Sequence, residues 1–346
     1  MRNRELTGSD SGREQTAVAW SRYWARGALH SCPNAFPADY GAEIRMLWAE
    51  FFAAQPSGAR ILDIGTGNGA IAFIARDTGT QRACAFEIEA IDLARIAPED
   101  AAAAHGVSTQ GVTFRGGVAS DATGYPDAWF DAVSSQFALE YMPIEPTLHE
   151  LARIVKPAGG ALFVIHHAAS RALLTTRHEL GSFDFLQHRV PLLVSARRYL
   201  RRLEAARTVE ELQRLANDSE TAAQAREIEG MVARVVDHAR TAPEAGFVGA
   251  IAAQVVTALR ETRTAGPAAG LERLRVLEEE MQAHRERLRA IGAAARGAQG
   301  IGKLARQLRE AGFAPHPARE LKVKGDDLIG WVLHATRVGQ AGSDVG

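Results

Sequence analysis

Short apolar runs alternate with stretches of helical periodicity between Arg60 and His167. This alternation is typical of βαβ units, in which helices connect the strands of a parallel sheet. It predicts an α/β fold with strands at Arg60–Ile64, Ala83–Glu87, Val112–Gly116, Phe130–Ser135 and Ala161–His166.

The pattern changes after this region. Residues 168–300 are rich in Ala, Arg, Glu and Leu with helical periodicity and contain no lysine, which predicts an all-helical insertion. A helix that ends at Gly312 and a strand over Leu328–Ala335 follow, so the sheet is expected to resume. The predicted domains are a flexible leader (1–17), a helical, aromatic lid segment (18–59), the α/β domain (60–167 plus 301–338) and the insertion (168–300).

Two patterns describe the inside of the insertion. Thr208 and Glu211 fit a capping box, which predicts a helix start. A heptad seam follows at Leu274, Leu277, Met281, His284, Leu288 and Ile291. The seam favours either an intramolecular helical bundle, in which His284 is a tolerated polar residue, or a coiled coil that makes a homodimer.

Composition narrows the class of protein. The 346 residues carry 41 acidic and 40 basic side chains, so no overall field favours nucleic acid or an anionic membrane. The two cysteines, Cys32 and Cys84, are too few for a disulfide framework or a zinc site. The chain shows no signal peptide and no apolar segment of membrane-spanning length. We therefore expect a cytoplasmic protein without a metal.

The glycine-rich segment ILDIGTGNGA at residues 61–70 is the clearest candidate site. A phosphate-binding P-loop is excluded because no lysine follows the glycines. Gly65, Gly67 and Ala70 formally satisfy the dinucleotide pattern. However, Asp63 at the end of the first predicted strand suits an amine-bearing ligand better than a pyrophosphate, and Asn68 begins a small pair that lets backbone amides approach a ligand.

Further motifs follow in order. Cys84-Ala-Phe-Glu87 ends the second predicted strand with an acid, Phe130-Asp-Ala-Val begins the fourth, and Arg153-Ile-Val-Lys-Pro-Ala-Gly-Gly160 precedes the fifth. Together with the glycine turn, this series resembles the class I S-adenosylmethionine-dependent methyltransferases. The resemblance implies a Rossmann-like, doubly wound, seven-stranded sheet interrupted by the helical insertion, with S-adenosylmethionine as cofactor and S-adenosylhomocysteine as product.

The resemblance also implies a set of cofactor-binding residues. Glu87 takes the place of the acid that binds the ribose hydroxyls in the family. Val118 stands where the family usually has an acid for adenine, and Asp121 is an alternative partner. The full implied set is Asp63, Gly65, Thr66, Gly67, Asn68, Gly69, Glu87, Ile88, Val118, Ala119 and Gln136.

Candidates for the chemistry follow the fourth and fifth predicted strands. Glu140 and Tyr141 are candidates to position a substrate, and His166 or His167 to act as a general base, because imidazole titrates near neutrality. The aromatic N-terminal segment is predicted to fold over the cofactor cleft and to bind substrate through Tyr23, Trp24, His30 and Tyr40.

The leading functional hypothesis is methyl transfer to an oxygen or nitrogen of a small organic acceptor. The alternative is a macromolecule methyltransferase that docks RNA or protein through the insertion, although the balanced charge argues against nucleic acid. A further alternative is a non-catalytic scaffold that keeps the cofactor fold for stability. The sequence does not identify the acceptor.

Overall fold

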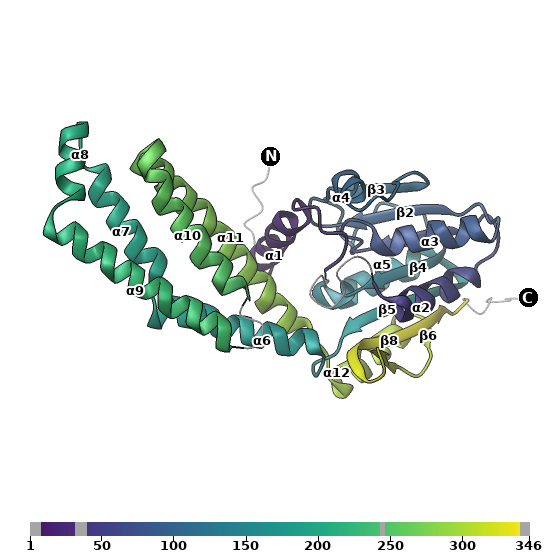
Figure 1. The fold of residues 1–346 in the computed structure, drawn as a ribbon. Helices are drawn as coiled ribbons and strands as arrows, with labels where there is room; N and C mark the ends of the chain where they lie inside the picture. The colour runs from purple at the N-terminus through teal and green to yellow at the C-terminus, as the bar shows by residue number, and fades with distance from the viewer. Residues whose placement is uncertain (1–7, 32–39, 243–245, 340–346) are drawn as a thin grey trace, which may run out of the picture. The chain divides into compact units, whose positions relative to one another are not determined.

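A computed structural model of the protein describes residues 8–31, 40–242 and 246–339 (Figure 1). The chain divides into two compact units. Unit 1 comprises Met1–Leu173 and Ala290–Gly346 and holds the sheet, and unit 2 comprises Leu174–Arg289 and is helical. The helical unit is thus narrower than the predicted insertion, because the residues at both ends of the range 168–300 belong to unit 1.

The sheet of unit 1 has eight strands in the order β3-β2-β1-β4-β5-β8-β6, with β7 also paired to β8. Strands β3, β2, β1, β4 and β5 are parallel to one another, and β8 is antiparallel to β5. Their bounds are β1 Arg60–Ile64, β2 Glu87–Asp92, β3 Val112–Gly116, β4 Phe130–Gln136, β5 Val155–His166, β6 Phe313–Pro315, β7 Arg319–Val323 and β8 Asp327–Arg337. The fold class is confirmed, with one strand more than the predicted seven.

Most strand positions agree with the sequence pattern, but β5 begins at Val155, six residues before the predicted Ala161, and β2 differs more. The prediction ended this strand at Glu87, whereas β2 begins there and continues to Asp92. Ile88 and Ile91 are buried, while Cys84, Ala85 and Phe86 keep partial or full exposure and lie before the strand. The buried and exposed positions of the strand therefore alternate over Glu87–Asp92 and not over the predicted Ala83–Glu87.

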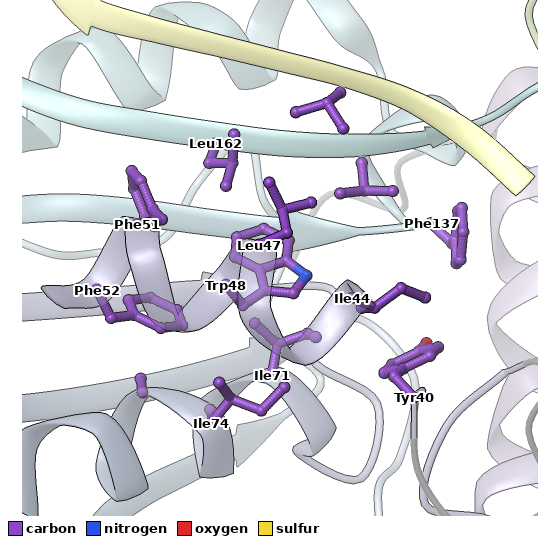
Figure 2. Close-up of a cluster of buried hydrophobic side chains, with 14 of the residues drawn as sticks. Tyr40, Ile44, Leu47, Trp48, Phe51, Phe52, Ile71, Ile74, Phe137 and Leu162 are labelled. Carbon is purple, nitrogen blue, oxygen red and sulfur yellow. The ribbon is translucent and has the colours of Figure 1, made fainter. Parts of the chain in front are cut away.

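Helices cover both faces of the sheet. On one face, α2 (Ala42–Ala53) and α3 (Ala70–Gln81) bury Trp48 and Phe52 against strand residues such as Leu162, as Figure 2 shows. On the other face lie α5 (Ile144–Ile154) and α12 (Ala298–Glu310). The short helix α4 (Pro98–Ala104) packs through Ala102 near α3. This is the three-layer arrangement expected of a doubly wound sheet.

The structure describes part of the predicted flexible leader, and that part is helical. Residues 8–17, expected to be flexible, form the first part of helix α1 (Gly8–Trp24). Arg13 on this helix pairs with Asp121 after β3, a contact distant in sequence that the leader's own composition does not reveal. Residues 1–7 and Cys32 lie outside the described residues.

Unit 2 is built from helices packed around their own apolar core. Leu274 and Leu277 of the predicted seam contribute to this core together with residues of α7, α9 and α10, such as Leu200, Val235 and Val255. The helices are α6 (Arg171–Asp184, beginning in unit 1), a π-helical turn (Phe185–Arg189), α7 (Leu192–Glu204), α8 (Val209–Ala216), α9 (Ser219–Thr241), α10 (Gly246–Ala265) and α11 (Pro267–Ala294, ending in unit 1). The seam therefore packs within the chain, and pairing of two chains stays a prediction.

Local details in unit 2 follow the sequence pattern. The Thr208 hydroxyl accepts a hydrogen bond from the Glu211 backbone amide at 3.2 Å, which confirms the predicted start of α8. His284 of the seam is bonded to the Glu179 carboxylate at 2.7 Å (Nε2 to Oε2). His284 is thus a satisfied polar residue. Within the described part of the chain, no helix combines the length and hydropathy needed to span a bilayer.

Within unit 1, the segment that precedes unit 2 is hydrogen-bonded to the segment that follows it. The Arg296 amide donates to the His166 carbonyl at 2.8 Å, and the Ala168 amide donates to the Arg296 carbonyl at 3.0 Å. Trp331 of β8 also donates its indole N–H to the Arg296 carbonyl, at 2.9 Å. The end of β5 and the start of the returning segment are thereby held together.

Candidate functional site

The glycine turn between β1 and α3 requires its glycines. Gly65, Gly67 and Gly69 have φ values of +64°, +55° and +95°, a region that side-chain-bearing residues rarely adopt. A Cβ on Gly65 would lie 2.3 Å from the Ala138 side chain, and one on Gly67 would lie 2.4 Å from the Trp24 ring. The turn therefore lets its backbone approach neighbouring groups closely.

Asp63 lies just before this turn, on β1, and is 1% exposed. Its Oδ1 accepts a hydrogen bond from the Ser134 hydroxyl at 2.7 Å, and the Thr66 hydroxyl is a further favourable neighbour of the carboxylate, while Oδ2 makes no bond of hydrogen-bond geometry to the described residues. Burial, aided by the charge of Asp92, raises the pKa of Asp63 to about 7, although hydrogen bonding works in the opposite direction. The carboxylate is therefore short of one donor or cation.

Asp92 ends β2 at the same edge of the sheet. Its two oxygens accept hydrogen bonds from the backbone amides of Gly67 at 2.9 Å and Ala94 at 2.8 Å. Burial raises its pKa to about 6, and the two amide donors limit that rise. This carboxylate fixes the second glycine of the turn and faces the same space as Asp63.

The prediction for Glu87 is wrong in position. Glu87 pairs in register with Arg60 at the start of β1, whereas the glycine turn follows the other end of β1. Its side chain is 66% exposed and forms an ion pair with Arg60 at 2.8 Å. Ile88, the next predicted residue, is buried in the core between the sheet and helices α2 and α3. Asp92, at the other end of β2, is the acid of this strand that lies beside the glycine turn.

A cavity of about 500 Å³ opens over the glycine turn within unit 1. It is formed by strand ends, by α1 and the segment after it, and by the turn that follows β4. The predicted residues that line it are Asp63, Gly65, Thr66, Val118, Gln136, Tyr141, Trp24, His30 and Tyr40. The predicted residues that do not line it are Gly67, Asn68, Gly69, Glu87, Ile88, Ala119, Glu140, His166, His167 and Tyr23.

Two further buried polar atoms lie at the Asp63 end of the cavity. Within the part of the chain that the structure describes, the Gln136 side-chain nitrogen lacks a hydrogen-bond partner, and the Thr66 hydroxyl, although a neighbour of the Asp63 carboxylate, makes no bond of hydrogen-bond geometry. The Gln136 side-chain oxygen, in contrast, accepts a hydrogen bond from the Trp48 indole. Because buried polar groups in folded proteins are generally bonded, these unpartnered atoms indicate a place for a polar ligand.

Asn68 is fully buried and fastens the turn to the chain around it. Its side-chain nitrogen donates to the carbonyls of Trp24 at 3.0 Å and Ala28 at 2.7 Å, and its oxygen accepts from the Ala97 amide at 2.9 Å. Asn68 therefore holds the end of α1 against the turn rather than facing the cavity.

The predicted general bases do not reach the cavity. His166 continues the row of β5 side chains that points toward α2 and α3, and its ring stacks on Phe137 with centroids 4.2 Å apart. Burial lowers the pKa of His166 to about 3, so the ring is neutral. His167 accepts from the Ala169 amide and packs on Trp331. Neither histidine is placed to take a proton from a molecule in the cavity.

The short 3₁₀ turn η1 (Leu139–Tyr141) separates the roles of Glu140 and Tyr141. Glu140 is buried and accepts the His166 backbone amide at 2.7 Å, and burial raises its pKa to about 7. Tyr141 lines the cavity, and the edge of its ring meets Trp20 at 5.9 Å between centroids. Of this pair, only Tyr141 is positioned to touch a substrate.

The aromatic N-terminal segment lies over the cavity as predicted, with one addition. Trp20 lines the cavity and stacks on Trp24 at 5.7 Å, although the sequence analysis did not select it. Its spacing of four residues from Trp24 on one helix face was the available signal. Tyr23 does not line the cavity. Its hydroxyl donates a hydrogen bond to the His30 carbonyl at 2.8 Å and thereby connects α1 to the segment that follows it.

Near β3 the cavity is lined by the apolar side chains of Val118 and Leu93 together with Ser120. The Val118 amide donates to the Asp92 carbonyl at 2.9 Å. Asp121, the alternative adenine partner, is bound by Arg13 with contacts of 2.5 and 3.1 Å, and this hydrogen bonding holds its pKa below the ordinary value. Among the described residues, no group of three metal-ligating side chains occurs.

Comparison with known families identifies this arrangement. Residues 38–207 match a family model described as a methyltransferase domain. The chain therefore contains a class I S-adenosylmethionine-dependent methyltransferase domain, and S-adenosylmethionine is the cofactor that this domain implies. No curated protein matches the sequence.

Solved structures show similarity at low identity. A chain from Haloferax volcanii, in a complex with the Trm112 methyltransferase activator, is 24% identical with a TM-score of 0.31, and the match covers 45% of this chain and 65% of that chain. An S-adenosylmethionine-dependent methyltransferase from Mesorhizobium loti is 23% identical with a TM-score of 0.30 and covers 38% and 57%. The matches thus span less than two thirds of these two proteins.

A longer match is found in Burkholderia thailandensis. Its 1,6-didemethyltoxoflavin-N1-methyltransferase, solved with 1,6-didemethyltoxoflavin and S-adenosylhomocysteine, is 13% identical with a TM-score of 0.45. The match covers 98% of this chain and 94% of that chain.

Proposed function

We propose that this protein transfers a methyl group from S-adenosylmethionine to an oxygen or nitrogen atom of a small organic acceptor bound in the unit 1 cavity. The observation that carries the proposal is the unpartnered Oδ2 of Asp63, buried beside the glycine turn and facing a cavity that continues beyond it. A buried carboxylate without a cation suits the ammonium group of an amino acid ligand.

The residues at this end of the cavity fit the cofactor along its length. Asp63 would accept hydrogen bonds from the ammonium group, and Asp92 would accept them from the ribose hydroxyls. The Thr66 hydroxyl would form a hydrogen bond with the amino acid portion of the cofactor. Val118 and Leu93 would pack on the adenine ring without a carboxylate to read its amino group.

The bound cofactor supplies a methyl group that its sulfonium already makes electrophilic, so the chain has to align an acceptor and exclude water. Trp20, Trp24 and Phe137 provide apolar walls for this purpose. For a hydroxyl acceptor a proton must also leave. Of the four side chains predicted for catalysis, Tyr141 lines the cavity and would orient the acceptor, while His166 is held neutral behind Phe137.

The apolar lining of the site favours a small acceptor over a macromolecule. Trp20 and Trp24 of α1 line the cavity, where a small organic molecule can pack on their rings. Binding of RNA through the Arg-rich insertion stays an alternative, and salt-sensitive retention of RNA would support it.

Isothermal titration calorimetry with S-adenosylhomocysteine tests the proposal. We expect one site per chain, and we expect Asp63→Asn to weaken binding because the amide carries no charge to pair with the ammonium group. Production of S-adenosylhomocysteine from S-adenosylmethionine, with small hydroxyl and amine compounds as acceptors, then tests transfer. Failure of S-adenosylhomocysteine to bind at millimolar concentration would leave only the scaffold hypothesis.

A further inference from the structure

Four aromatic side chains from separate parts of unit 1 meet in the cavity. Trp20 and Trp24 come from α1, Phe137 follows β4 directly, and Tyr141 belongs to η1. Trp20 connects this set, because it stacks on Trp24 with an interplanar angle of 22° and meets Tyr141 edge-on at 78°. We call these four side chains the aromatic wall.

The aromatic wall begins at the glycine turn. The Trp24 ring is so close to Gly67 that a Cβ on that glycine would lie 2.4 Å from the ring. The Trp24 carbonyl accepts the Asn68 side chain, which fastens the ring's own residue to the turn. A molecule that packs on Trp20 and Tyr141 would therefore lie next to a cofactor bound at the turn.

The orientation of Phe137 is maintained by an unusual backbone. Phe137 has φ +52°, a left-handed conformation that side-chain-bearing residues avoid, and its amide donates to the Val164 carbonyl at 2.7 Å. The neutral ring of His166 stacks on it within 6° of parallel. Strained residues persist where the surroundings hold them, and they gather at functional sites. Here the strained residue adds a ring to the cavity surface.

Charges around the cavity disfavour an anionic acceptor. Arg13, a cation that lines the cavity, already forms an ion pair with Asp121 at 2.5 Å. Asp63 and Asp92 contribute acidic groups at the cofactor end. A neutral molecule with an extended apolar face is therefore the better match to the space beside the aromatic wall. Flat rings gain a further attraction from ring–ring contacts that saturated rings lack.

We propose that the acceptor is a neutral, planar aromatic or heteroaromatic compound that packs on the aromatic wall and presents a ring hydroxyl or ring nitrogen as the nucleophile. This inference rests on the proposed function. A lone pair of the ring oxygen or nitrogen forms the new bond to the methyl carbon while the carbon–sulfur bond breaks. The electron pair of that bond stays on sulfur, and the acceptor's proton passes to water.

Three matched probes test this inference with the full chain saturated with S-adenosylhomocysteine: 2-naphthol, its saturated counterpart decahydro-2-naphthol, and tetramethylammonium. Calorimetry gives each dissociation constant. We expect 2-naphthol to bind at least tenfold more tightly than the other two. Equal or tighter binding of decahydro-2-naphthol would overturn the inference, and so would tighter binding of tetramethylammonium, which would make the aromatic wall a cation site.

Variants locate the effect on the aromatic wall. We expect Trp20→Leu to weaken 2-naphthol binding about tenfold and to leave S-adenosylhomocysteine binding unchanged. We expect Trp20→Phe, which keeps an aromatic ring, to retain most of the affinity for 2-naphthol. Tyr141→Leu provides a second test if Trp20→Leu does not fold. Trp129→Leu is the control, because Trp129 packs under Arg60 away from the cavity. Unchanged 2-naphthol binding in both Trp20→Leu and Tyr141→Leu would refute the assignment.

Two failures can be distinguished. If S-adenosylhomocysteine binds and 2-naphthol does not, the proposal of a planar acceptor is wrong and the methyltransferase function stands. If S-adenosylhomocysteine itself does not bind, the proposed function fails together with the inference that rests on it.

Discussion

The two carboxylates at the ends of β2 allow a paired test of the cofactor site. Asp92 lies at the glycine turn and accepts one backbone amide on each oxygen, from Gly67 and Ala94. Glu87 begins the same strand and is mostly exposed beside Arg60. We therefore compare Asp92→Asn with Glu87→Gln, since each change removes one charge and keeps the shape of the side chain.

The expected magnitudes follow from these contacts. In Asp92→Asn an amide nitrogen must face one of the two backbone donors, which lowers stability, and the side chain no longer offers a charged oxygen to the ribose hydroxyls, so at least one charge-assisted hydrogen bond to the cofactor is lost. Such a bond contributes about 1.5–3 kcal/mol. Because 1.4 kcal/mol corresponds to roughly a tenfold change in affinity, binding of S-adenosylhomocysteine should weaken about 10- to 100-fold. An exposed ion pair contributes about 0–1 kcal/mol to stability, so Glu87→Gln should leave binding unchanged.

Isothermal titration calorimetry at about pH 8 measures both effects, because the Asp92 carboxyl, with its pKa near 6, is then ionised. Thermal melting of the unliganded variants separates a loss of binding from a loss of folding. Our placement of the ribose-binding acid would be refuted if Glu87→Gln weakened binding as much as Asp92→Asn, or if neither change had an effect.

Three further predictions concern other parts of the molecule. Burial holds the pKa of Asp63 near 7, above its ordinary value of 3.8, so ionisation destabilises the unliganded protein. Its melting temperature should fall as the pH rises from about 4 to 7, the interval between the ordinary and the raised pKa, and an equally steep fall in Asp63→Asn would contradict this. Gly67→Ala should abolish S-adenosylhomocysteine binding, because its Cβ would lie 2.4 Å from an indole ring. Gly106→Ala, which shares a positive φ but has open space around it, should cost only about 1 kcal/mol of stability and bind normally. In unit 2, Glu179→Ala leaves His284 without its 2.7 Å partner and should lower the free energy of unfolding by about 1–3 kcal/mol in a denaturant titration. No measurable change there would show that this bond does not stabilise the unit.

The sequence predicts the sheet well where apolar runs have only one possible register. The bounds of β1 and β3 agree with the prediction because Gly and polar residues flank each run closely. The second strand has no such boundary, since Cys84-Ala-Phe and Ile88-Glu-Ala-Ile are both acceptable strand sequences. Pairing with β1 decides between them, and that contact is not local in sequence.

Among the site residues, too, those with local roles could be predicted from the sequence and those placed by distant contacts could not. Asp63 and the glycines are recognisable because their roles depend on the local turn and its φ angles. The position of His166 behind Phe137 depends on how β5 packs against α2, and the sequence position of His166 at a strand end does not reveal it. Trp20 lies in the segment predicted to be a helical, aromatic lid, but which of its rings face the cavity depends on how α1 packs over the glycine turn, and that contact is not local in sequence.

The hydrogen bonds that join His166, Ala168 and Arg296 bring the two ends of the helical segment together. Residues 169–295 therefore form one insertion, and the two residues that flank it, Ala168 and Arg296, are hydrogen-bonded to each other. A short connection in place of those residues would leave the bonded ends where they are, since closing a short loop between adjacent points costs little entropy. A chain with such a connection in place of the helical segment should therefore keep the fold of the sheet.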